Sequence, residues 1–438
     1  MIISKNLYKA GYLTVFILAL AIAAWRMPAY ASRMPWLLTM AIADLYLFWH
    51  LSSGGIINKP WLRKVLVFIT GLPSALLMLF FLSLAFLSPV DWNPILRTYL
   101  LGFVVFFYLI RLMPLLVLIL FDLRKSITQL ARKSFHLANK RVWLKISAVF
   151  SAILGIAMIM GMTLWVYDFE IIEEEIHIEN LPTAFEGYRI VQLSDIHLGR
   201  WHSQKPLQKA VEMVNSLDAD LIAFTGDLVN YATSEALPFT ETLSSLSAKD
   251  GVFAVLGNHD YGDYMRWPNA HAKEMNDTLM NNVIKGMGWF LLENRNVKLF
   301  RDKQCIVVAG TGNYSDNEHY PDRSDVRLSL AGIPDSCKVI LLTHTPSIIG
   351  PELLQKQHVD LILSGHTHGL QLGLKVGKRK YSPASIIYQY WGGLFSIENN
   401  GQGKSYIYVN RGLGHIFFPF RIGMKPEITL LTLKSMKE

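Results

Sequence analysis

Five long apolar stretches dominate the first part of the chain. They cover residues 11–25, 36–51, 65–88, 95–121 and 144–167, and polar or charged residues separate them. Most of them reach the length of about 20 residues that a helix needs to cross the hydrocarbon core of a bilayer. They also lack the polar face that a surface helix of a soluble protein shows. The pattern predicts a transmembrane helical domain of about five spans over residues 1–167.

The pattern changes after residue 170. Short runs rich in β-branched residues alternate with helical patterns such as residues 206–219, and each run ends in a cluster of Gly, Asn, Asp or His. Strands that alternate with helices are typical of α/β folds. We therefore expect a linker and a first strand over residues 168–184 and an α/β domain over residues 185–438.

Charge is divided unevenly between these two parts. Residues 1–167 contain 16 Lys and Arg against three Asp, a net charge of +13, while the remaining residues contain 26 Lys and Arg against 31 Asp and Glu, a net charge of −5. The basic balance of the chain, +8 overall, therefore belongs to the membrane part and does not indicate nucleic acid as a partner. The partner that this charge pattern predicts is the bilayer.

The distribution of Lys and Arg also predicts the orientation of the chain. Seven of these residues lie between the fourth and fifth apolar stretches, within residues 124–145. Loops rich in Lys and Arg stay in the cytoplasm. If the fifth stretch crosses the bilayer, the α/β domain lies on the periplasmic or extracellular side of a bacterial plasma membrane.

Residues 1–31 have a second interpretation. Lys5 and Lys9 precede the first apolar run, and Ala29-Tyr30-Ala31 resembles the cleavage site of a signal peptide. An uncleaved anchor is favoured because further spans follow.

Two charged residues lie inside the apolar stretches, Asp44 and Arg111. Charges within a membrane are costly and often functional. Nothing nearby completes a transport pathway, so the sequence favours a structural ion pair between packed helices.

Candidate metal ligands follow the predicted strands of the α/β domain. Carboxylate, imidazole and carboxamide groups suit divalent ions such as Mn²⁺, Fe²⁺ or Zn²⁺. In open α/β sheets the active site lies beyond the carboxyl ends of the strands. Five predicted strands deliver such groups to this edge: Asp195 and His197, Asp227, Asn258 with His259 and Asp260, His344, and His366 with His368.

The ordered motifs D-x-H, G-D, G-N-H-D, H and G-H-T-H resemble those of the calcineurin-like metallophosphoesterase family, and specifically its membrane-attached YkuE/YaeI-like members. The resemblance covers about residues 185–433. It implies an α/β sandwich of two sheets flanked by helices and a centre of two divalent metal ions. One departure is visible, because Leu370 stands where many relatives have a second glycine after the last histidine.

Carried over by motif, the resemblance assigns each ligand. Asp195, His197, Asp227 and His368 would hold one ion, and Asp227, Asn258, His344 and His366 would hold the other. Asp227 would bridge the two ions. His259 would stand beside the leaving group as a catalytic acid, and Asp260 would orient its imidazole.

Three further residues are candidate substrate contacts. Arg411 could bind a phosphate with two hydrogen bonds, Tyr261 follows the catalytic motif, and Trp391 could meet an acyl chain or the membrane interface. Local packing or an ion pair is the alternative for each. Cys305 and Cys337 each begin a predicted strand; they could pair in an oxidising compartment, but two buried free thiols are favoured.

These observations predict a membrane-anchored phosphohydrolase with two metal ions that cleaves a phosphoester or pyrophosphate bond, with a lipid-linked substrate favoured. Two alternatives stay open. One is a phosphodiesterase for small nucleotides that uses the membrane part only as an anchor. The other is a catalytically inactive transporter or receptor, which the complete ligand set disfavours.

Overall fold

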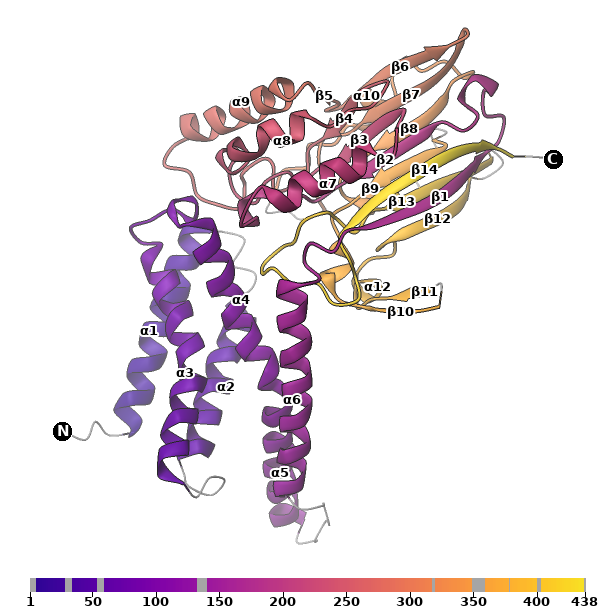
Figure 1. The fold of residues 1–438 in the computed structure, drawn as a ribbon. Coiled ribbons are helices and arrows are strands. Elements are labelled where there is room, and N and C mark those ends of the chain that lie inside the picture. Colours follow the sequence, from indigo (N-terminus) through magenta and orange to yellow (C-terminus); the bar gives the residue numbers. More distant parts are fainter. Residues whose placement is uncertain are drawn as a thin grey trace. The chain divides into compact units, whose positions relative to one another are not determined.

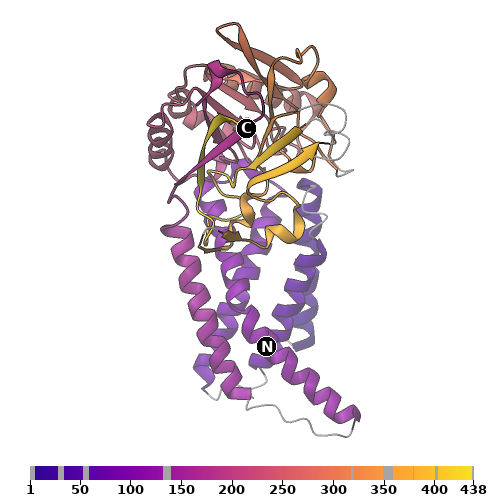
Figure 2. The same cartoon turned by 90° about the vertical axis from the view of Figure 1, so that its right-hand side faces the viewer.

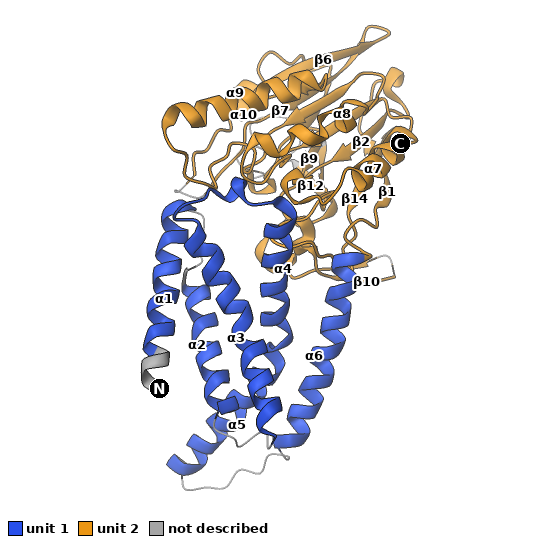
Figure 3. Cartoon of the chain, turned by 60° about the vertical axis from the view of Figure 1, so that its left-hand side comes forward, with its two compact units in different colours: residues 1–163 blue, residues 164–438 orange. Residues whose placement is uncertain are grey.

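A computed structural model describes residues 5–27, 34–52, 59–131, 140–316, 320–348, 359–377, 379–399 and 403–436. The chain forms two compact units, Met1–Thr163 and Leu164–Glu438, which are coloured separately in Figure 3. The expected cleavage site at residues 29–31 lies outside the described residues.

Unit 1 is a bundle of helices that run lengthwise beside one another (Figures 1 and 2). Each of the five predicted stretches falls on helical segments. The helices are α1 (Lys5–Arg26), α2 (Met34–Ser52), α3 (Pro60–Ser83), α4 (Pro94–Ile110), α5 (Leu112–Ala131) and α6 (Lys140–Thr163).

Three helical segments among the described residues are long and apolar enough to cross a membrane: Pro60–Ser83, Pro94–Leu130 and Lys140–Thr163. A shorter apolar helix covers Ala10–Arg26. These segments support a membrane protein, while the number of five spans stays a prediction.

The predicted fourth stretch differs from the structure, because it is broken at Arg111 into α4 and α5. Pro114 explains the break. A proline ring clashes with the carbonyl group four residues before it, here that of Ile110, and offers no N–H donor. The interruption therefore has a local cause, although Pro73 lies within the unbroken helix α3.

Asp44 lies at the centre of a polar cluster that joins four helices of unit 1. Its carboxylate accepts hydrogen bonds from the hydroxyls of Tyr12 (2.9 Å), Tyr108 (2.6 Å) and Ser74. Its other oxygen lies 2.8 Å from the Arg111 guanidinium. The pairing of Asp44 with Arg111 agrees with a structural ion pair between packed helices.

We expect Asp44→Asn to destabilise unit 1, because Arg111 would keep a buried charge without its counter-ion. Breaking such a pair costs about 3–5 kcal/mol, which corresponds to a loss on the order of 10 °C in the unfolding midpoint. The midpoint of the full chain in nanodiscs measures this effect. The double variant Asp44→Asn, Arg111→Gln should recover part of the loss; if it is less stable than the single variant, the pair is not what matters.

Unit 2 is built on two six-stranded sheets and a two-stranded sheet. The first sheet has the order β1-β14-β2-β3-β4-β5 and the second has the order β12-β13-β9-β8-β7-β6. The strands of the first sheet are β1 (Glu170–Ile178), β14 (Glu427–Ser435), β2 (Arg189–Leu193), β3 (Leu221–Thr225), β4 (Val252–Val255) and β5 (Phe290–Leu291). The strands of the second are β12 (Gly393–Asn399), β13 (Gly403–Val409), β9 (Leu361–Ser364), β8 (Lys338–Leu342), β7 (Gln304–Gly310) and β6 (Arg295–Arg301).

Helices flank this sandwich. They are α7 (Lys205–Asn215), α8 (Thr240–Ser244), α9 (Ala270–Gly286), α10 (Val326–Ser329) and α12 (Ala384–Ile387); β10 (Leu374–Val376) and β11 (Arg379–Tyr381) form the two-stranded sheet. One core lies between the sheets, where Ile190 and Phe253 of the first sheet share a cluster with Ile340 and Leu363 of the second. A second core joins the outer face of the first sheet to α7 and α9. The predicted α/β sandwich of two sheets flanked by helices is confirmed.

Cys305 and Cys337 form a disulfide bond between β7 and β8. The strands pair in parallel with Ile306 opposite Lys338, so the two cysteines, one residue earlier, face each other with their Cα atoms 4.9 Å apart. The structure thus contains a disulfide in place of the two free thiols that the sequence favoured.

Candidate metal centre

The predicted ligands gather where the strands of both sheets end. Strands β2, β3 and β4 are parallel neighbours in the first sheet, and β8 and β9 are parallel neighbours in the second. Parallel neighbours present their carboxyl ends at one edge. The loops that follow carry the seven candidate ligands, Asp195, His197, Asp227, Asn258, His344, His366 and His368.

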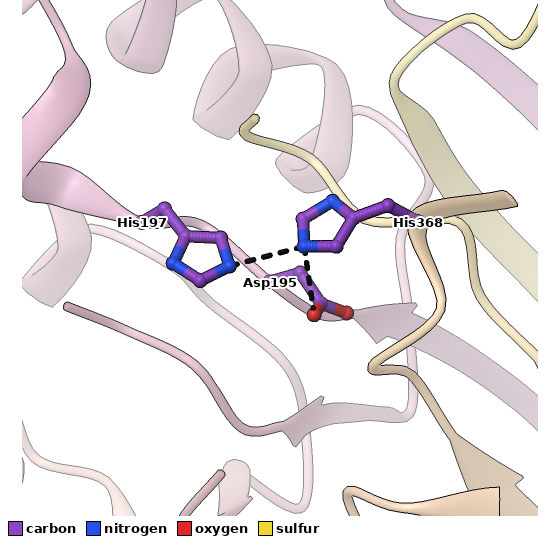
Figure 4. Close-up of side chains that lie close together, drawn as sticks. All are labelled: Asp195, His197 and His368. Atoms are coloured by element: carbon purple, nitrogen blue, oxygen red, sulfur yellow. Dashed lines mark hydrogen bonds and ion pairs between the residues drawn. The ribbon is translucent and has the colours of Figure 1, made fainter. Parts of the chain in front are cut away.

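One group of ligands joins the loop after β2 to the loop after β9. Figure 4 shows Asp195, His197 and His368 pointing toward one another. The Nε2 atom of His368 lies 3.0 Å from His197 Nε2 and 3.2 Å from Asp195 Oδ1. All three side chains are buried, and their ligand atoms lie within 4.8 Å of one another. A carboxylate and two imidazoles at this spacing could hold one divalent ion.

Asp227 connects this group to a second one. Its Oδ2 atom lies 3.5 Å from His197 Nε2 and 3.2 Å from His344 Nε2. His344 Nε2 in turn lies 3.2 Å from His366 Nδ1, which lies 2.9 Å from the Asn258 side-chain oxygen. One carboxylate oxygen thus stands between the two groups, as a bridging ligand would.

Backbone carbonyl groups orient the imidazoles. The Nδ1 atom of His344 lies 2.8 Å from the Thr225 carbonyl oxygen, and His197 Nδ1 lies 3.3 Å from that of Val229. A carbonyl oxygen accepts a hydrogen bond from an Nδ1–H group, so the proton of the neutral ring sits on Nδ1 and the Nε2 lone pair is directed into the cluster. These imidazoles are therefore arranged as metal ligands.

The ligand loops adopt an uncommon backbone conformation. Positive φ angles occur at Asp195 (52°), His197 (52°), Asp227 (61°), His366 (73°) and His368 (51°). Such angles cost folding free energy in residues other than glycine and concentrate at functional sites. The surrounding fold thus holds these residues in place for a purpose other than stability.

The electrostatics of the cluster favour a cation. Burial alone would lower the pKa of His344, but the Asp227 carboxylate outweighs it and raises this pKa to about 9. Burial lowers the pKa of His366 to about 4, which favours the neutral form that binds metals. A divalent ion beside Asp227 would supply the positive charge that a proton on His344 supplies otherwise. The donor set therefore fits divalent metal.

His259 stands beside these ligands. Its ring stacks on Tyr264 at 4.1 Å between centroids, and its Nδ1 atom lies 2.8 Å from the Asn230 carbonyl oxygen. Its backbone N–H donates to Asp227 Oδ1 at 2.9 Å. Burial lowers the pKa of the His259 ring. Neither Asn230 nor Tyr264 was expected from the sequence, although both lie within five residues of a motif.

The Asp260 carboxylate does not contact the His259 imidazole, which it was expected to orient. The carbonyl oxygen of Asn230 takes that place. The buried carboxylate of Asp260 instead accepts hydrogen bonds from four backbone N–H groups, those of Asp227, Leu228, Val229 and Gly257. It thus fixes the loop that carries Asp227 and is a positioning residue.

We expect Asp260→Asn to destabilise unit 2 by about 2–4 kcal/mol, because an amide cannot accept all four hydrogen bonds and its NH₂ group would face donors. Denaturant unfolding of the full chain in detergent measures this loss. Asp325→Asn, at the exposed start of α10, is a matched control that should lose much less. Unchanged stability together with lost activity would instead support the expected contact with His259.

The three candidate substrate contacts each have a partner within the protein. The buried Arg411 guanidinium forms an ion pair with Glu427, which supports the ion-pair alternative. The buried Tyr261 hydroxyl donates to Glu293 at 2.7 Å. Trp391 contributes its carbonyl oxygen, which accepts a hydrogen bond from Thr367 between the two histidines of the last motif.

A cavity of about 250 Å³ opens beside the ligands Asn258 and His366. Tyr264, Tyr320 and Tyr388 line it. This cavity could not be expected from the sequence, because its walls come from separate loops.

Comparisons with known proteins agree with this geometry. Residues 188–370 match the family described as calcineurin-like phosphoesterase, a domain that uses divalent metals to hydrolyse phosphoesters. The transmembrane protein with metallophosphoesterase domain of Danio rerio is 31% identical over 274 residues, which cover 61% of this chain and 57% of that protein. The uncharacterized metallophosphoesterase YkuE of Bacillus subtilis is 31% identical over 271 residues, which cover 61% of this chain and 86% of YkuE.

A third relative carries a more specific name. The UDP-2,3-diacylglucosamine pyrophosphatase LpxG of Chlamydia trachomatis is 29% identical over 300 residues, which cover 58% of this chain and 86% of that protein. The chain thus spans little more than half of the zebrafish relative but most of the two bacterial ones. With its ligand cluster at the shared sheet edge, the chain belongs to the calcineurin-like metallophosphoesterase family.

Proposed function

We propose that the chain is a membrane-anchored phosphohydrolase that uses two divalent metal ions to cleave a phosphoester or pyrophosphate bond of a lipid-linked substrate. The observation that carries this proposal is the Asp227 carboxylate, which stands between two groups of buried or half-buried ligands. Asp195, His197, Asp227 and His368 would hold one ion, and Asp227, Asn258, His344 and His366 the other. Mn²⁺, Fe²⁺ or Zn²⁺ suit these ligands.

When bound, such a pair of ions lowers the pKa of water and neutralises charge on the phosphoryl oxygens. The chain supplies the rest. Thr225 and Val229 carbonyl groups keep the ligand imidazoles oriented, and the Asp260 carboxylate keeps the Asp227 loop in place. His259 reaches the same site and donates a proton to the leaving oxygen, which contributes roughly 10²–10⁴-fold in rate.

Two observations support a lipid-linked substrate. The chain has helices that are suited to a bilayer, so an anchored site meets lipids at high local concentration. A relative is named as a pyrophosphatase of a diacylated nucleotide sugar. The substrate class that we propose is accordingly a phosphate or pyrophosphate attached to an acylated group.

A second candidate function rests on the cavity beside the ligands. The rings of Tyr264 and Tyr320 lie 5.2 Å apart in its wall, and aromatic walls can stack on a nucleobase. A phosphodiesterase for small nucleotides would use this cavity for the base.

A substrate screen separates these functions. The full chain in nanodiscs is supplied with Mn²⁺ and offered lipid phosphates, diphosphate lipids and cyclic nucleotides, each with and without chelator. Chelator-sensitive turnover that is highest on the lipids supports the first function, and turnover on nucleotides alone supports the second. Absence of metal-dependent turnover on every phosphoester would contradict both and leave an inactive receptor domain.

We further propose that the catalytic unit lies outside the cytoplasm of a bacterial cell. The Lys and Arg residues of segment 124–145 support this side, and so does the Cys305–Cys337 disulfide, because disulfides persist in oxidising compartments. A reporter fused after residue 438 tests the side. A reporter that is active only in the cytoplasm would contradict this orientation.

A further inference from the structure

The segment 370–387, directly after the last metal-binding motif, exposes a run of large apolar side chains. They are Leu370, Leu372, Leu374, Val376, Tyr381, Ile386 and Ile387. Ile386 is 86% exposed and Leu374 is 68% exposed. Elsewhere in the described part of unit 2, exposed large apolar side chains are separated in sequence. A contiguous exposed apolar patch marks an interaction surface.

The hairpin of β10 and β11 has its apolar face turned outward. Residues that pair across strands share a face. Lys375 pairs with Lys380, and both ammonium groups bind Glu170 of β1, at 3.3 and 3.1 Å. The other face carries Leu374 opposite Tyr381 and Val376 opposite Arg379. A hairpin that packed for stability would bury this second face and leave the lysines in water.

Leu370 reinforces this interpretation. Its φ angle of 48° lies in the left-handed region, which a leucine adopts at a cost that a glycine would avoid. The side chain remains exposed, so burial within the described fold does not compensate this cost. A leucine at this position is therefore better explained by an external contact.

The segment lies beside the metal centre, as one contact from within it and one from the next residue show. The Ser382 hydroxyl, just before α12, donates to the Gly369 carbonyl oxygen at 2.6 Å, next to His368. Directly after the segment, the ring of Tyr388 meets the ring of His366 edge-on, with centroids 5.9 Å apart. In Figure 1 the strands β10 and β11 and the helix α12 lie together at one end of unit 2. Whatever contacts this surface lies beside the candidate ligands.

We propose that segment 370–387, the docking segment, inserts its apolar face into the interface of an anionic bilayer and places the metal centre at the lipid headgroups. The charge of the segment supports an anionic bilayer as its partner, since the segment contains four Lys and Arg and lacks Asp and Glu. Chain connectivity supports it as well. Glu170, which binds both lysines of the hairpin, lies seven residues after the end of α6. The backbone between these two points can span about 24 Å at most, whatever angle the two units adopt.

A fluorescent label on the full chain tests this surface without requiring turnover. The native cysteines are paired, so Ile386→Cys provides a single thiol for an environment-sensitive dye. In nanodiscs with phosphatidylglycerol, spin-labelled lipid should quench at least about half of the emission, because interfacial side chains lie about 5–10 Å into the bilayer surface. Leu328→Cys, an exposed leucine of α10, is the matched control and should stay unquenched.

Two results would overturn the docking segment. Free access of aqueous iodide to the Ile386 label, without quenching by lipid, would show that the face remains in water. Shielding from both iodide and lipid would show that protein covers it, such as a second copy of the chain.

A kinetic test adds the link to the proposed hydrolase, on which this second arm rests. The double variant Ile386→Asp, Ile387→Asp should lower the ratio of turnover on vesicle-borne lipid phosphate to turnover on soluble p-nitrophenyl phosphodiester by about tenfold or more. Leu328→Asp should leave this ratio unchanged. An unchanged ratio in the double variant argues against docking, whereas absence of turnover in the unmodified chain overturns only the hydrolase and leaves the fluorescence result to decide the docking.

Discussion

Replacement of Asp227 by alanine is expected to remove metal from both positions and to reduce turnover on the order of 10⁴-fold, or about 5.4 kcal/mol of activation free energy. Its Oδ2 atom stands between His197 and His344, so each proposed ion loses a charged ligand at once. Its Oδ1 atom also accepts the backbone N–H of His259. The loss therefore reaches the metal positions and the candidate acid together.

Metal content per chain by mass spectrometry and kcat/KM on a p-nitrophenyl phosphodiester measure the two effects. Asp250→Asn serves as the matched control, because Asp250 precedes β4 and contacts Tyr188 and Arg301 at the opposite end of the strand. This control should keep its metal. Two ions per chain and full activity in Asp227→Ala would contradict the ligand assignment.

His259→Ala should behave in the opposite way, with metal retained and turnover reduced about 10²–10⁴-fold. Metal is retained because the contact with Asp227 is made by the backbone N–H of residue 259, which alanine keeps. The reduction should be largest for alkyl leaving groups, which need a proton, and smaller for p-nitrophenolate, which leaves without one.

The same experiment distinguishes a second role for this residue. The ring of His259 lies close enough to His197 and Asp227 to act as a metal ligand. Loss of one ion per chain in His259→Ala would assign it that role in place of proton donation. His271→Ala, an exposed histidine of α9, should change neither the metal content nor the rate.

The convergence of the metal ligands could be predicted from the sequence because strand ends in parallel sheets are a geometric constraint. A polar residue directly after a buried parallel strand has little choice of location, as Asp227 after β3 and His366 after β9 illustrate. The break at Arg111 was less accessible. Pro114 accounts for it, but Pro73 lies inside the unbroken helix α3, so a proline in an apolar stretch does not by itself locate a break.

The partners of individual side chains could not be predicted in this way. Asp260 meets four backbone N–H groups of two loops, and Arg411 meets Glu427 sixteen residues away. Such contacts depend on tertiary packing, which motif spacing does not encode. The docking segment was missed for a related reason, because apolar residues in a sequence do not reveal whether they face the core or the surroundings.

The division of the ligands between the two sheets has a consequence for the whole unit. Asp195, His197, Asp227 and Asn258 follow strands of the first sheet, whereas His344, His366 and His368 follow strands of the second. Ions held in this way would cross-link the two sheets of the sandwich. Metal affinity and folding would then be thermodynamically linked. Substitutions deep in the core could then present as weakened metal binding, and metal supply during synthesis could decide how much protein reaches its folded form.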